Sequence, residues 1–343
     1  MKQYHNLCGS ILKNGYATGD RTGTGTIAMP GYSYQCKLNM DEEGVIHDFP
    51  LLTTKFVSLK SIFEELIWKL RGDTNIKFLI EHNNHIWTEW PFKKWLEDTG
   101  QIRNIQMWKD AEKSDYADEW KAEKKSFEEK ILTDSEFCQQ WGGLGRTYGH
   151  QFRHFGEITA SELTPEVQSF LNKGGLLDPE YVVKKGEDQL MDAVSLILNN
   201  PENRRIIISL WNPSDVKKTL LPPCPCFYQF FANQNGYLHL NMYQRSSDSF
   251  LGVPYNTAQD SLLLVLMAHV TGLKPGIFNH FFGDAHIYRN HIKQVKEQLV
   301  RVPKELPSLK INKQTTNILD FEFSDLELIG YNPEKGIKGA VSI

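Results

Sequence analysis

The sequence predicts an α+β protein, in which helices and strands pack around a common core. In residues 60–70 apolar side chains recur every three or four positions, as in an amphipathic helix. Residues 226–231 and 237–244 are apolar, aromatic strands, and the Asn235-Gly236 pair between them is typical of a hairpin turn. Residues 257–271 are almost entirely apolar, which indicates a buried helix. Because 40% of the 343 residues are apolar and 12% aromatic, a substantial core can form.

The remaining elements follow the same two periodicities. We expect helices at residues 3–14, 189–199 and 288–300, and strands at residues 27–39, 45–53 and 204–211. The stretch from Gly252 to Asn256 is predicted to be a turn that leads into the long apolar helix.

Two polar stretches differ from the rest of the chain. Residues 91–143 are dominated by Lys, Glu, Asp and Trp, so we interpret them as surface helices or a charged insertion of mixed sign. Residues 157–186 are also polar and are predicted to be peripheral. We assign chemistry to neither stretch.

The bulk composition excludes several classes of protein. A net charge of −4 gives no basic field for nucleic acid, so nucleic acid is an unlikely partner. No signal-peptide core opens the sequence, and the longest apolar run, 261–273, is too interrupted to span a membrane. Five irregularly spaced cysteines predict free thiols in a reducing, cytoplasmic location. His82 and His85 lack further ligands at metal-site spacing, so we expect no metal.

Cys224 is the strongest candidate for a nucleophile. It lies between Pro223 and Pro225, which stiffen the backbone, just before an apolar strand. A lone cysteine is more often a core thiol. However, Arg204-Arg205 and Arg245 flank it in the sequence, and a guanidinium lowers the pKa of a nearby thiol. Arginines also bind phosphate in a bidentate manner, so the pattern indicates covalent chemistry on a phosphorylated small molecule.

Several other segments allow both a structural and a functional interpretation. The glycine-rich loop 19–26 is either a hairpin turn or a mobile loop that carries Arg21 to an anion. Glu65 borders the apolar face of its helix, and it could transfer protons if it were partly buried. Trp87 and Trp90 fit core packing or stacking on a flat ligand. His286 shares a strand face with Tyr288, although such a histidine is more often structural.

Six segments, taken together and in order, resemble the thymidylate synthase family, and the similarity extends over nearly the whole chain. They are Arg-Thr-Gly-Thr-Gly-Thr (21–26), Arg-Arg-Ile-Ile (204–207), Pro-Pro-Cys (222–224), Gln-Arg-Ser (244–246), Gly-Val-Pro-Tyr-Asn (252–256) and Gly-Asp-Ala-His-Ile-Tyr (283–288). The resemblance implies a single catalytic domain over 1–343, with surface insertions at 91–143 and 157–186. It also implies a large mixed β-sheet flanked by helices, and an obligate homodimer in which two such sheets pack back to back. The implied substrate is dUMP, and the one-carbon donor is 5,10-methylenetetrahydrofolate.

The resemblance also assigns roles to residues. Cys224 would attack C6 of the uracil, so that C5 captures the one-carbon unit. Glu65 and Tyr148 would manage the proton transfers, and Asn256 would bind the edge of the base, with its carboxamide suited to uracil. The implied substrate-binding residues are Arg21, Gln244, Arg245, Ser246, Asn256, His286 and Tyr288, with Arg204 and Arg205 reaching the phosphate from the partner subunit. The implied folate-binding residues are Lys55, Trp87, Trp90, Asp248 and Val341, of which Asp248 would bind the pterin and belong to the catalytic set, and Val341 is part of a closing tail.

Two positions depart from the commoner family pattern, and one pair of residues is also unusual. Pro225 stands where a histidine usually follows the nucleophile, Phe56 stands where a basic residue is usual, and the Gln259-Asp260 pair is uncommon. Loss of the imidazole and of the charge leaves two products open, a methyl group with dihydrofolate or a hydroxymethyl group with tetrahydrofolate. Trp87 and the full-length tail favour methyl transfer, because both help to exclude water. A nucleotide-binding protein without catalysis is a further alternative.

Overall fold

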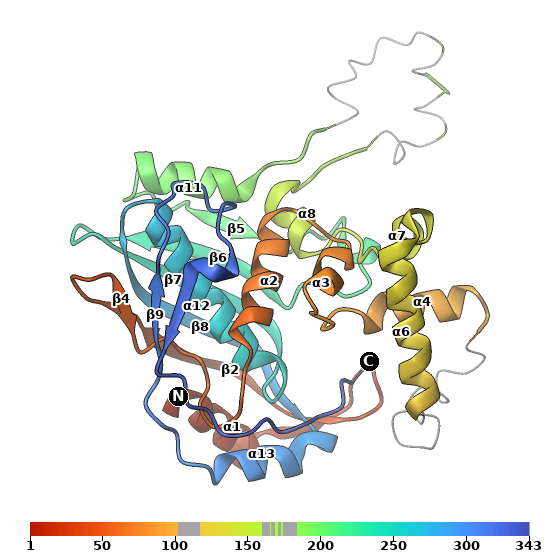
Figure 1. Ribbon diagram of the computed structural model, residues 1–343, viewed down its shortest axis with the longest axis horizontal. Helices are drawn as coiled ribbons and strands as arrows, with labels where there is room; N and C mark the ends of the chain where they lie inside the picture. Colours follow the sequence, from red (N-terminus) through yellow and green to blue (C-terminus); the bar gives the residue numbers. More distant parts are fainter. Residues whose placement is uncertain (102–116, 160–164, 166–168, 171–172, 174–183, 343) are drawn as a thin grey trace.

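A six-stranded mixed sheet forms the centre of the protein (Figure 1). The computed structural model describes residues 1–101, 117–159 and 184–342, with isolated positions between 160 and 183. The strand order is β1-β2-β8-β7-β6-β5. The strands span Tyr16–Thr18 (β1), Thr26–Lys37 (β2), Ile207–Ser209 (β5), Pro225–Ala232 (β6), Tyr237–Asp248 (β7) and Lys274–Tyr288 (β8). Only β7 and β8 among these pair in parallel, so the prediction of a mixed sheet is confirmed.

Helix α12, Gly252–Val270, connects the two parallel strands. Parallel neighbours require a crossover connection, and α12 supplies it between β7 and β8. Its side chains from Thr257 to Ala268 are all buried, because the helix packs between the sheet and helix α2, Leu59–Leu70 (Figure 1). The segment Gly252–Asn256, predicted as a turn, is instead the start of α12; the carboxylate of Asp248 accepts the backbone N–H groups of Phe250 and Leu251 and so orders the approach.

A smaller antiparallel sheet of four strands covers the other face of α12. Its order is β10-β9-β4-β3. The strands span Asn39–Met40 (β3), Val45–His47 (β4), Ser308–Ile311 (β9) and Leu326–Ile329 (β10). The predicted strand 45–53 therefore ends early, at His47, because the chain then leaves the sheet and buries Phe49, Leu51 and Leu52 in the core.

Helices α1 (Lys2–Asn14), α11 (Gln189–Asn199) and α13 (Ile292–Leu299) agree with the predicted periodicities, whereas α8 (Tyr148–Arg153) was not predicted. The 3-10 turns are Val216–Lys218, Arg289–His291 and Phe323–Asp325. The serine before α2 and the aspartate before α11 cap their helices through side-chain oxygens. The predicted strand 204–211 is reduced to the three residues of β5, because the arginines before it are exposed and unpaired with the sheet.

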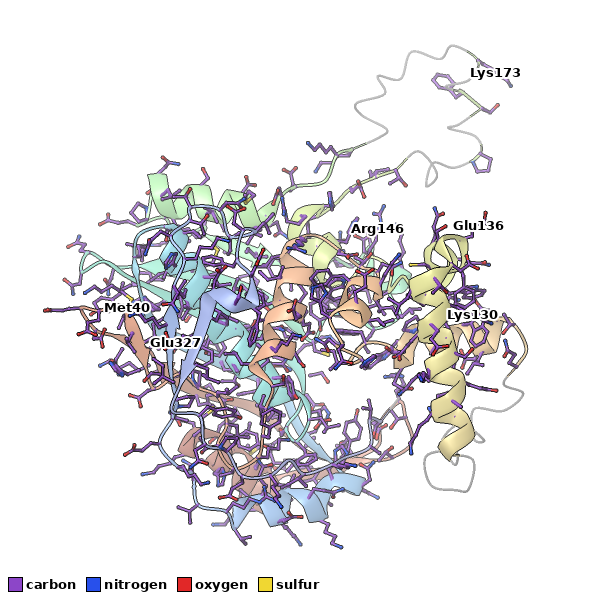
Figure 2. The ribbon with its side chains drawn as sticks, viewed as in Figure 1. Met40, Lys130, Glu136, Arg146, Lys173 and Glu327 are labelled. Carbon is purple, nitrogen blue, oxygen red and sulfur yellow. The ribbon has the colours of Figure 1, made fainter. Side chains whose placement is uncertain are left out.

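A helical lobe lies beside the main body (Figure 1). Its helices are α3 (Lys77–Glu81), α4 (Glu89–Asp98), α6 (Ala117–Thr133) and α7 (Ser135–Trp141). Figure 2 shows Lys130 and Glu136 on this lobe, far from Met40 and Glu327 on the small sheet. The predicted surface helices in 91–143 are present, but they also contain an aromatic core. In it the ring of Phe127 packs against the rings of Phe92 and Phe137. The middle of this stretch and most of the predicted insertion 157–186 lie outside the described residues.

Candidate active site

The thiol of Cys224 lies at the entrance of β6, where the sequence placed it. The residue is half-buried in a turn, and the carbonyl oxygen of Cys224 accepts the backbone N–H of Arg245 at 2.9 Å. A β-bulge interrupts the pairing with β7 between Pro225 and Phe227. The extra residue bends the strand start away from a regular ladder, so the sulfur is held beside the sheet edge rather than within it.

The guanidinium of Arg245 binds the turn that carries the thiol. Its Nε donates to the carbonyl of Pro223 and its Nη2 to the carbonyl of Pro222, both at 2.8 Å. The same Nη2 lies 3.8 Å from Sγ of Cys224, and the guanidinium also lies over the ring of Trp211. Proline lacks a backbone donor, so these carbonyls depend on a side-chain cation to fix the turn.

Burial raises the pKa of the Cys224 thiol above its ordinary value, which corrects the prediction that nearby guanidinium groups would lower it. Arg245, Tyr148, Lys69 and Arg21 all act in the opposite direction but do not outweigh desolvation. The predicted proximity to cations therefore holds for Arg21 and Arg245. The thiol becomes a nucleophile only where a base or a bound substrate assists its deprotonation.

Tyr148, on α8, contacts the nucleophile turn directly. Its phenolic oxygen accepts the backbone N–H of Cys224 at 2.8 Å. Complete burial, reinforced by the charge of Cys224, raises the pKa of Tyr148 well above its ordinary value, so the phenol keeps its proton. Its ring also meets the indole of Trp87 edge-on, with 5.8 Å between centroids.

Glu65, on α2, is buried at 7% exposure, so it is not a solvated surface glutamate. Its Oε1 accepts from Nε1 of Trp87 at 2.9 Å and lies 2.8 Å from Nζ of Lys69. Its Oε2 accepts from Nε2 of Gln259 at 2.8 Å. Three N–H donors thus converge on the two carboxylate oxygens and hold the group in one orientation.

The carboxamide of Asn256 is held in place by its neighbours. Gln244 donates from Nε2 to Oδ1 of Asn256 and to the backbone carbonyl of Ser246, both at 3.0 Å. His280 in turn contacts Oε1 of Gln244 at 2.8 Å. Because Gln244 and His280 are buried between β7, β8 and α12, they hold the amide of Asn256 in an orientation ready to hydrogen-bond the edge of a ligand.

His286 and Tyr288 are near the end of β8, as predicted, with ring centroids 5.1 Å apart. His286 pairs across the sheet with Asp248. The loop before β2 is a hairpin whose Asp20 carboxylate accepts the backbone N–H groups of Thr22 and Gly25, and it presents Arg21 to solvent. The hairpin turn is thus confirmed, and the delivery of Arg21 to an anion by a mobile loop stays a prediction.

Four further predicted site residues are Arg204, Arg205, Lys55 and Val341. Arg204 and Arg205, predicted to act at the partner subunit's phosphate, are exposed before β5. Lys55 is buried at 4% exposure, where its Nζ donates to the carbonyl of Phe250 and lies over the ring of that residue; burial lowers the pKa of Lys55 to about 8. Val341 is 40% exposed in the C-terminal tail.

Trp90 completes an aromatic wall with Trp87, at 5.1 Å between centroids. Its Nε1 is buried and has no hydrogen-bond partner among the described residues. Trp87 itself is buried and also contacts Trp68, so core packing and ligand contact are combined in this pair. A buried unpaired indole N–H is costly unless a ligand or water satisfies it.

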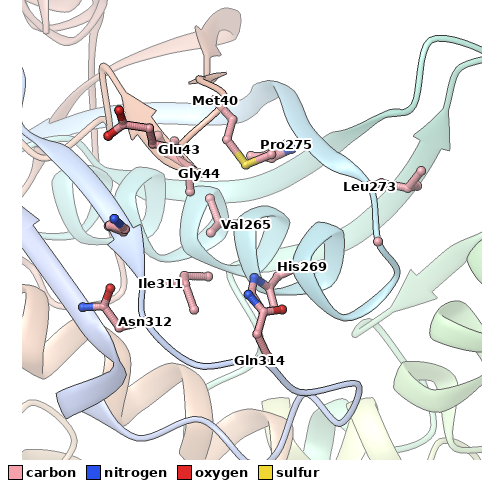
Figure 3. A pocket seen from close by; sticks show the side chains of 13 residues that line it. Met40, Glu43, Gly44, Val265, His269, Leu273, Pro275, Ile311, Asn312 and Gln314 are labelled. Atoms are coloured by element: carbon pink, nitrogen blue, oxygen red, sulfur yellow. The ribbon is translucent and has the colours of Figure 1, made fainter.

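Other features of the described residues do not add a site. No group of three or more His, Cys, Asp or Glu side chains in that part of the chain could hold a metal ion. No helix described there is both long and apolar enough to cross a membrane. A separate hollow lies at the far end of α12, where Val265 and His269 face Ile311 and Gln314 of the small-sheet region (Figure 3). None of the predicted site residues lines it.

Three candidate site residues were not predicted from the sequence. Lys69, Gln259 and Asp260 are buried around Glu65, although Gln259-Asp260 was noted as uncommon. Two signals could have found them. Lys69 follows Glu65 by one helical turn within an apolar segment, and the polar pair opens the most apolar helix of the chain.

The fold and the site define a class of protein: an α+β protein with a constrained thiol, converging cations and a fixed carboxamide, suited to covalent chemistry on a phosphorylated small molecule. The family profile described as thymidylate synthase matches residues 2–343. Proteins named thymidylate synthase from Listeria monocytogenes and Listeria innocua are each 40% identical to this chain over 348 residues, with all of both chains covered. The chain belongs to the thymidylate synthase family.

Proposed function

We propose that the protein is a thymidylate synthase, which transfers one carbon from 5,10-methylenetetrahydrofolate to C5 of dUMP and yields dTMP and dihydrofolate. The observation that carries the proposal is the constrained thiol of Cys224, held by Arg245 and Tyr148, in a chain of this family. The proteins named thymidylate synthase cover the whole chain, and they do not favour the hydroxymethylase alternative.

The chemistry begins with the thiolate of Cys224. The sulfur adds to C6, and the electron pair of the C5–C6 double bond moves to C5, which forms a bond to the one-carbon unit. A base removes the C5 proton, and elimination of the folate amine leaves an exocyclic methylene group. A hydride from the tetrahydrofolate completes the methyl group, the sulfur leaves C6, and dihydrofolate is released. The electron pair of each new bond thus comes from the thiolate or from a bond that breaks during these steps.

Individual side chains have separate tasks in this proposal. Arg21, Arg245 and Ser246 bind the phosphate, and His286 and Tyr288 hold the ribose hydroxyl. Asn256, fixed by Gln244, binds the edge of the uracil. Glu65, a buried carboxylate, and Tyr148, a phenol that keeps its proton, supply the acceptor and the donor that the proton transfers need.

The folate is proposed to bind against the tryptophan wall. The unpartnered Nε1 of Trp90 fits a ligand acceptor, and the ring of Trp87 lies between Glu65 and Tyr148. Asp248 is assigned to the pterin, and Val341 to the tail that closes over both ligands. Lys55 supports that closure, because its Nζ donates to the carbonyl of Phe250. The ring of Phe250 in turn lies next to Gly339 of the tail.

We further propose that two copies pack through the outer face of the large sheet. Adjacent register positions on that face carry Phe227, Tyr243 and Phe281, which are 39%, 44% and 42% exposed in the single chain. Phe231 on the same strand is 54% exposed. A contiguous aromatic face of this kind is unfavourable in water and is typical of an interface. Back-to-back packing would bring Arg204 and Arg205 of each copy to the other subunit's phosphate.

The five cysteines support a reducing compartment, which we propose to be the cytoplasm. All five are free, including Cys8 and Cys36, whose thiols are buried. Burial raises the pKa of both to about 12, so neither is reactive at neutral pH. The structure therefore depends on no disulfide.

Incubation with dUMP and 5,10-methylenetetrahydrofolate, followed by mass analysis of the nucleotide, tests the activity. Gain of a methyl group with formation of dihydrofolate is the expected result. Gain of a hydroxymethyl group would replace the proposal by the hydroxymethylase. Trapping with 5-fluoro-dUMP and folate should label Cys224, and the Cys224→Ala variant is the control that should form no adduct. An unlabelled wild-type protein would indicate binding without catalysis.

A further inference from the structure

A buried lysine lies one helical turn beyond Glu65. Lys69 is 4% exposed and Glu65 7% exposed, and Nζ of Lys69 lies 2.8 Å from Oε1 of Glu65. A charged ammonium is costly to bury unless it is paired and fully hydrogen-bonded. Its presence in the buried last turn of α2, next to the carboxylate assigned to proton transfer, therefore calls for a functional explanation.

Gln259 closes a ring between the two charged groups. Lys69 donates from Nζ to Oε1 of Gln259 at 2.7 Å, and Gln259 donates from Nε2 to Oε2 of Glu65 at 2.8 Å. Trp87 adds a third donor, to Oε1 of Glu65. The carboxylate thus accepts on both oxygens, and its orientation is fixed from three elements of the fold.

The same ammonium contacts the second proton-transfer residue. Nζ of Lys69 lies 4.4 Å from the centroid of the Tyr148 ring, in a cation–π arrangement. The phenolic oxygen of Tyr148 accepts the backbone N–H of Cys224. Lys69 is therefore in contact with both Glu65 and Tyr148.

A second carboxyl group lies behind the ring. Asp260 is buried at 2% exposure, its Oδ1 accepts from Oη of Tyr228 at 3.1 Å, and its Oδ2 has no partner among the described residues. Burial raises the pKa of Asp260 to about 7, while Lys69 and Tyr228 oppose the shift and Glu65 adds to it. The positive charge of Lys69 is thus placed where two carboxyl groups can use it.

We propose that Lys69 is a positioning residue for the proposed reaction: its ammonium keeps Glu65 ionised and fixed beside Tyr148 before the substrates bind. The inference rests on the proposed function of this site. Lys69 touches neither the nucleotide nor the sulfur; it acts through Glu65 and the Tyr148 ring. Without it, a carboxylate in this interior would have no countercharge and would be protonated more easily.

The proposal predicts a pH effect that a purely structural lysine would not produce. The titratable groups that face Lys69 or its carboxylate partner are Glu65 on α2, Tyr148 on α8, Asp260 and Tyr255 on α12, Tyr228 on β6 and Cys224 before it. The tyrosines, whose pKa values burial raises, stay neutral across the working range. The carboxyl groups of Glu65 and Asp260 are therefore the groups through which Lys69 acts.

The test compares Lys69→Met with Lys69→Arg. Lys69→Met keeps the length of the side chain without its charge, whereas Lys69→Arg keeps the charge. For Lys69→Met we expect kcat near neutral pH to fall by roughly tenfold or more, and the acidic limb of the kcat profile to move up by about one pH unit or more. The KM for dUMP should change little. Lys69→Arg should retain the acidic limb of the wild type.

A folded Lys69→Met with the wild-type profile would overturn the inference, as would a loss of kcat at all pH values without a shift. If wild-type protein forms neither dTMP nor a 5-fluoro-dUMP adduct, the proposed function fails instead. Should Lys69→Met not fold, infrared difference spectra of the wild type against Glu65→Gln decide the matter. A carboxylate band of Glu65 at about pH 5, close to the ordinary range of glutamic acid, supports the inference; a protonated Glu65 at about pH 7 overturns it.

Discussion

The backbone N–H of Cys224 donates a hydrogen bond to the phenolic oxygen of Tyr148 at 2.8 Å. The bond joins the nucleophile turn before β6 to helix α8, which is separated from it by 76 positions in the chain. Since the phenolic oxygen only accepts in this bond, its own proton remains available for another acceptor. One tyrosine therefore fixes the position of the thiol and keeps a proton available.

Tyr148→Phe should separate these two roles. Loss of the acceptor leaves the N–H of Cys224 unsatisfied, which should cost about 1–3 kcal/mol of stability. Loss of the proton donor should lower kcat by roughly 10²-fold to 10⁴-fold, while the KM for dUMP stays within a few-fold. The adduct with 5-fluoro-dUMP should still form, because the thiol and Arg245 remain. A variant with wild-type kcat would show that Tyr148 takes no part in proton transfer.

Arg245 should set the pH at which Cys224 becomes reactive. Burial raises the pKa of this thiol and Arg245 is the largest opposing influence, so removal of the guanidinium should raise the pKa further. We expect the rate of alkylation by iodoacetamide to reach its midpoint at higher pH in Arg245→Gln than in the wild type, with Arg245→Lys in between. Peptide mass analysis distinguishes Cys224 from Cys226. An unchanged or lower midpoint would contradict this account.

The C-terminal tail should tolerate no side chain at Gly339. A Cβ there would lie 2.7 Å from the ring of Phe250 and 3.0 Å from Nε2 of His291, which also contacts the carbonyl of Ala340. Gly339→Ala should displace the tail, raise the KM for the folate and lower kcat, because water enters the site. Gly336→Ala is the matched control, since nothing lies within 4 Å of its Cβ. Equal kinetics for the two variants would exclude a closing role for the docked tail.

Much of the fold follows from the sequence because its strongest patterns are local. Helix α2 and the β6–β7 hairpin were predicted from periodicity and from Asn235-Gly236, and both are present. The predictions failed where tertiary contacts decide. Residues 48–53 are largely apolar like a strand but fill the core instead, and Asp248 orders the approach to α12 by accepting the backbone N–H groups of Phe250 and Leu251.

The site was predictable to the extent that it is encoded in residue type. Cys224, Arg245 and Asn256 were singled out, and the structure holds each of them by specific hydrogen bonds. The direction of the thiol pKa was not predictable, because it depends on how far burial outweighs the cations. Lys69 was marked in the sequence only by its position one helical turn after Glu65, and its contact with Gln259, which joins positions 190 residues apart, has no local signal.

The aromatic face of the large sheet should control assembly. Phe231→Glu places a charge on that face and should convert a dimer to monomers, as measured by sedimentation velocity. Activity should be lost with the dimer, because Arg204 and Arg205 would no longer reach the other subunit's site. Val300→Glu is the control, since this valine is 80% exposed at the C-cap of α13 and belongs to no strand of the sheet. A monomeric wild type, or a dimeric Phe231→Glu variant, would rule out this face.

Asp260 should make the stability of the protein fall as the pH rises. Its pKa is raised to about 7 in the folded state, against an ordinary value near 4 in the unfolded chain. The folded state therefore binds this proton more tightly, so the contribution of Asp260 to stability is full below about pH 4 and is lost as the pH rises through about 7.

Asp260→Asn keeps a neutral side chain that can still accept from Tyr228, and it removes this titration. Relative to the variant, the free energy of unfolding of the wild type should decline between about pH 4 and pH 8, by at most about 1.4 kcal/mol for each pH unit. Denaturant unfolding of both proteins across this range measures the difference, and titrations that they share cancel. Asp192→Asn, at an exposed position on α11, should show no such trend. A difference that is flat, or that favours the wild type at high pH, would mean that Asp260 is ionised in the folded protein throughout, with Lys69 as its countercharge.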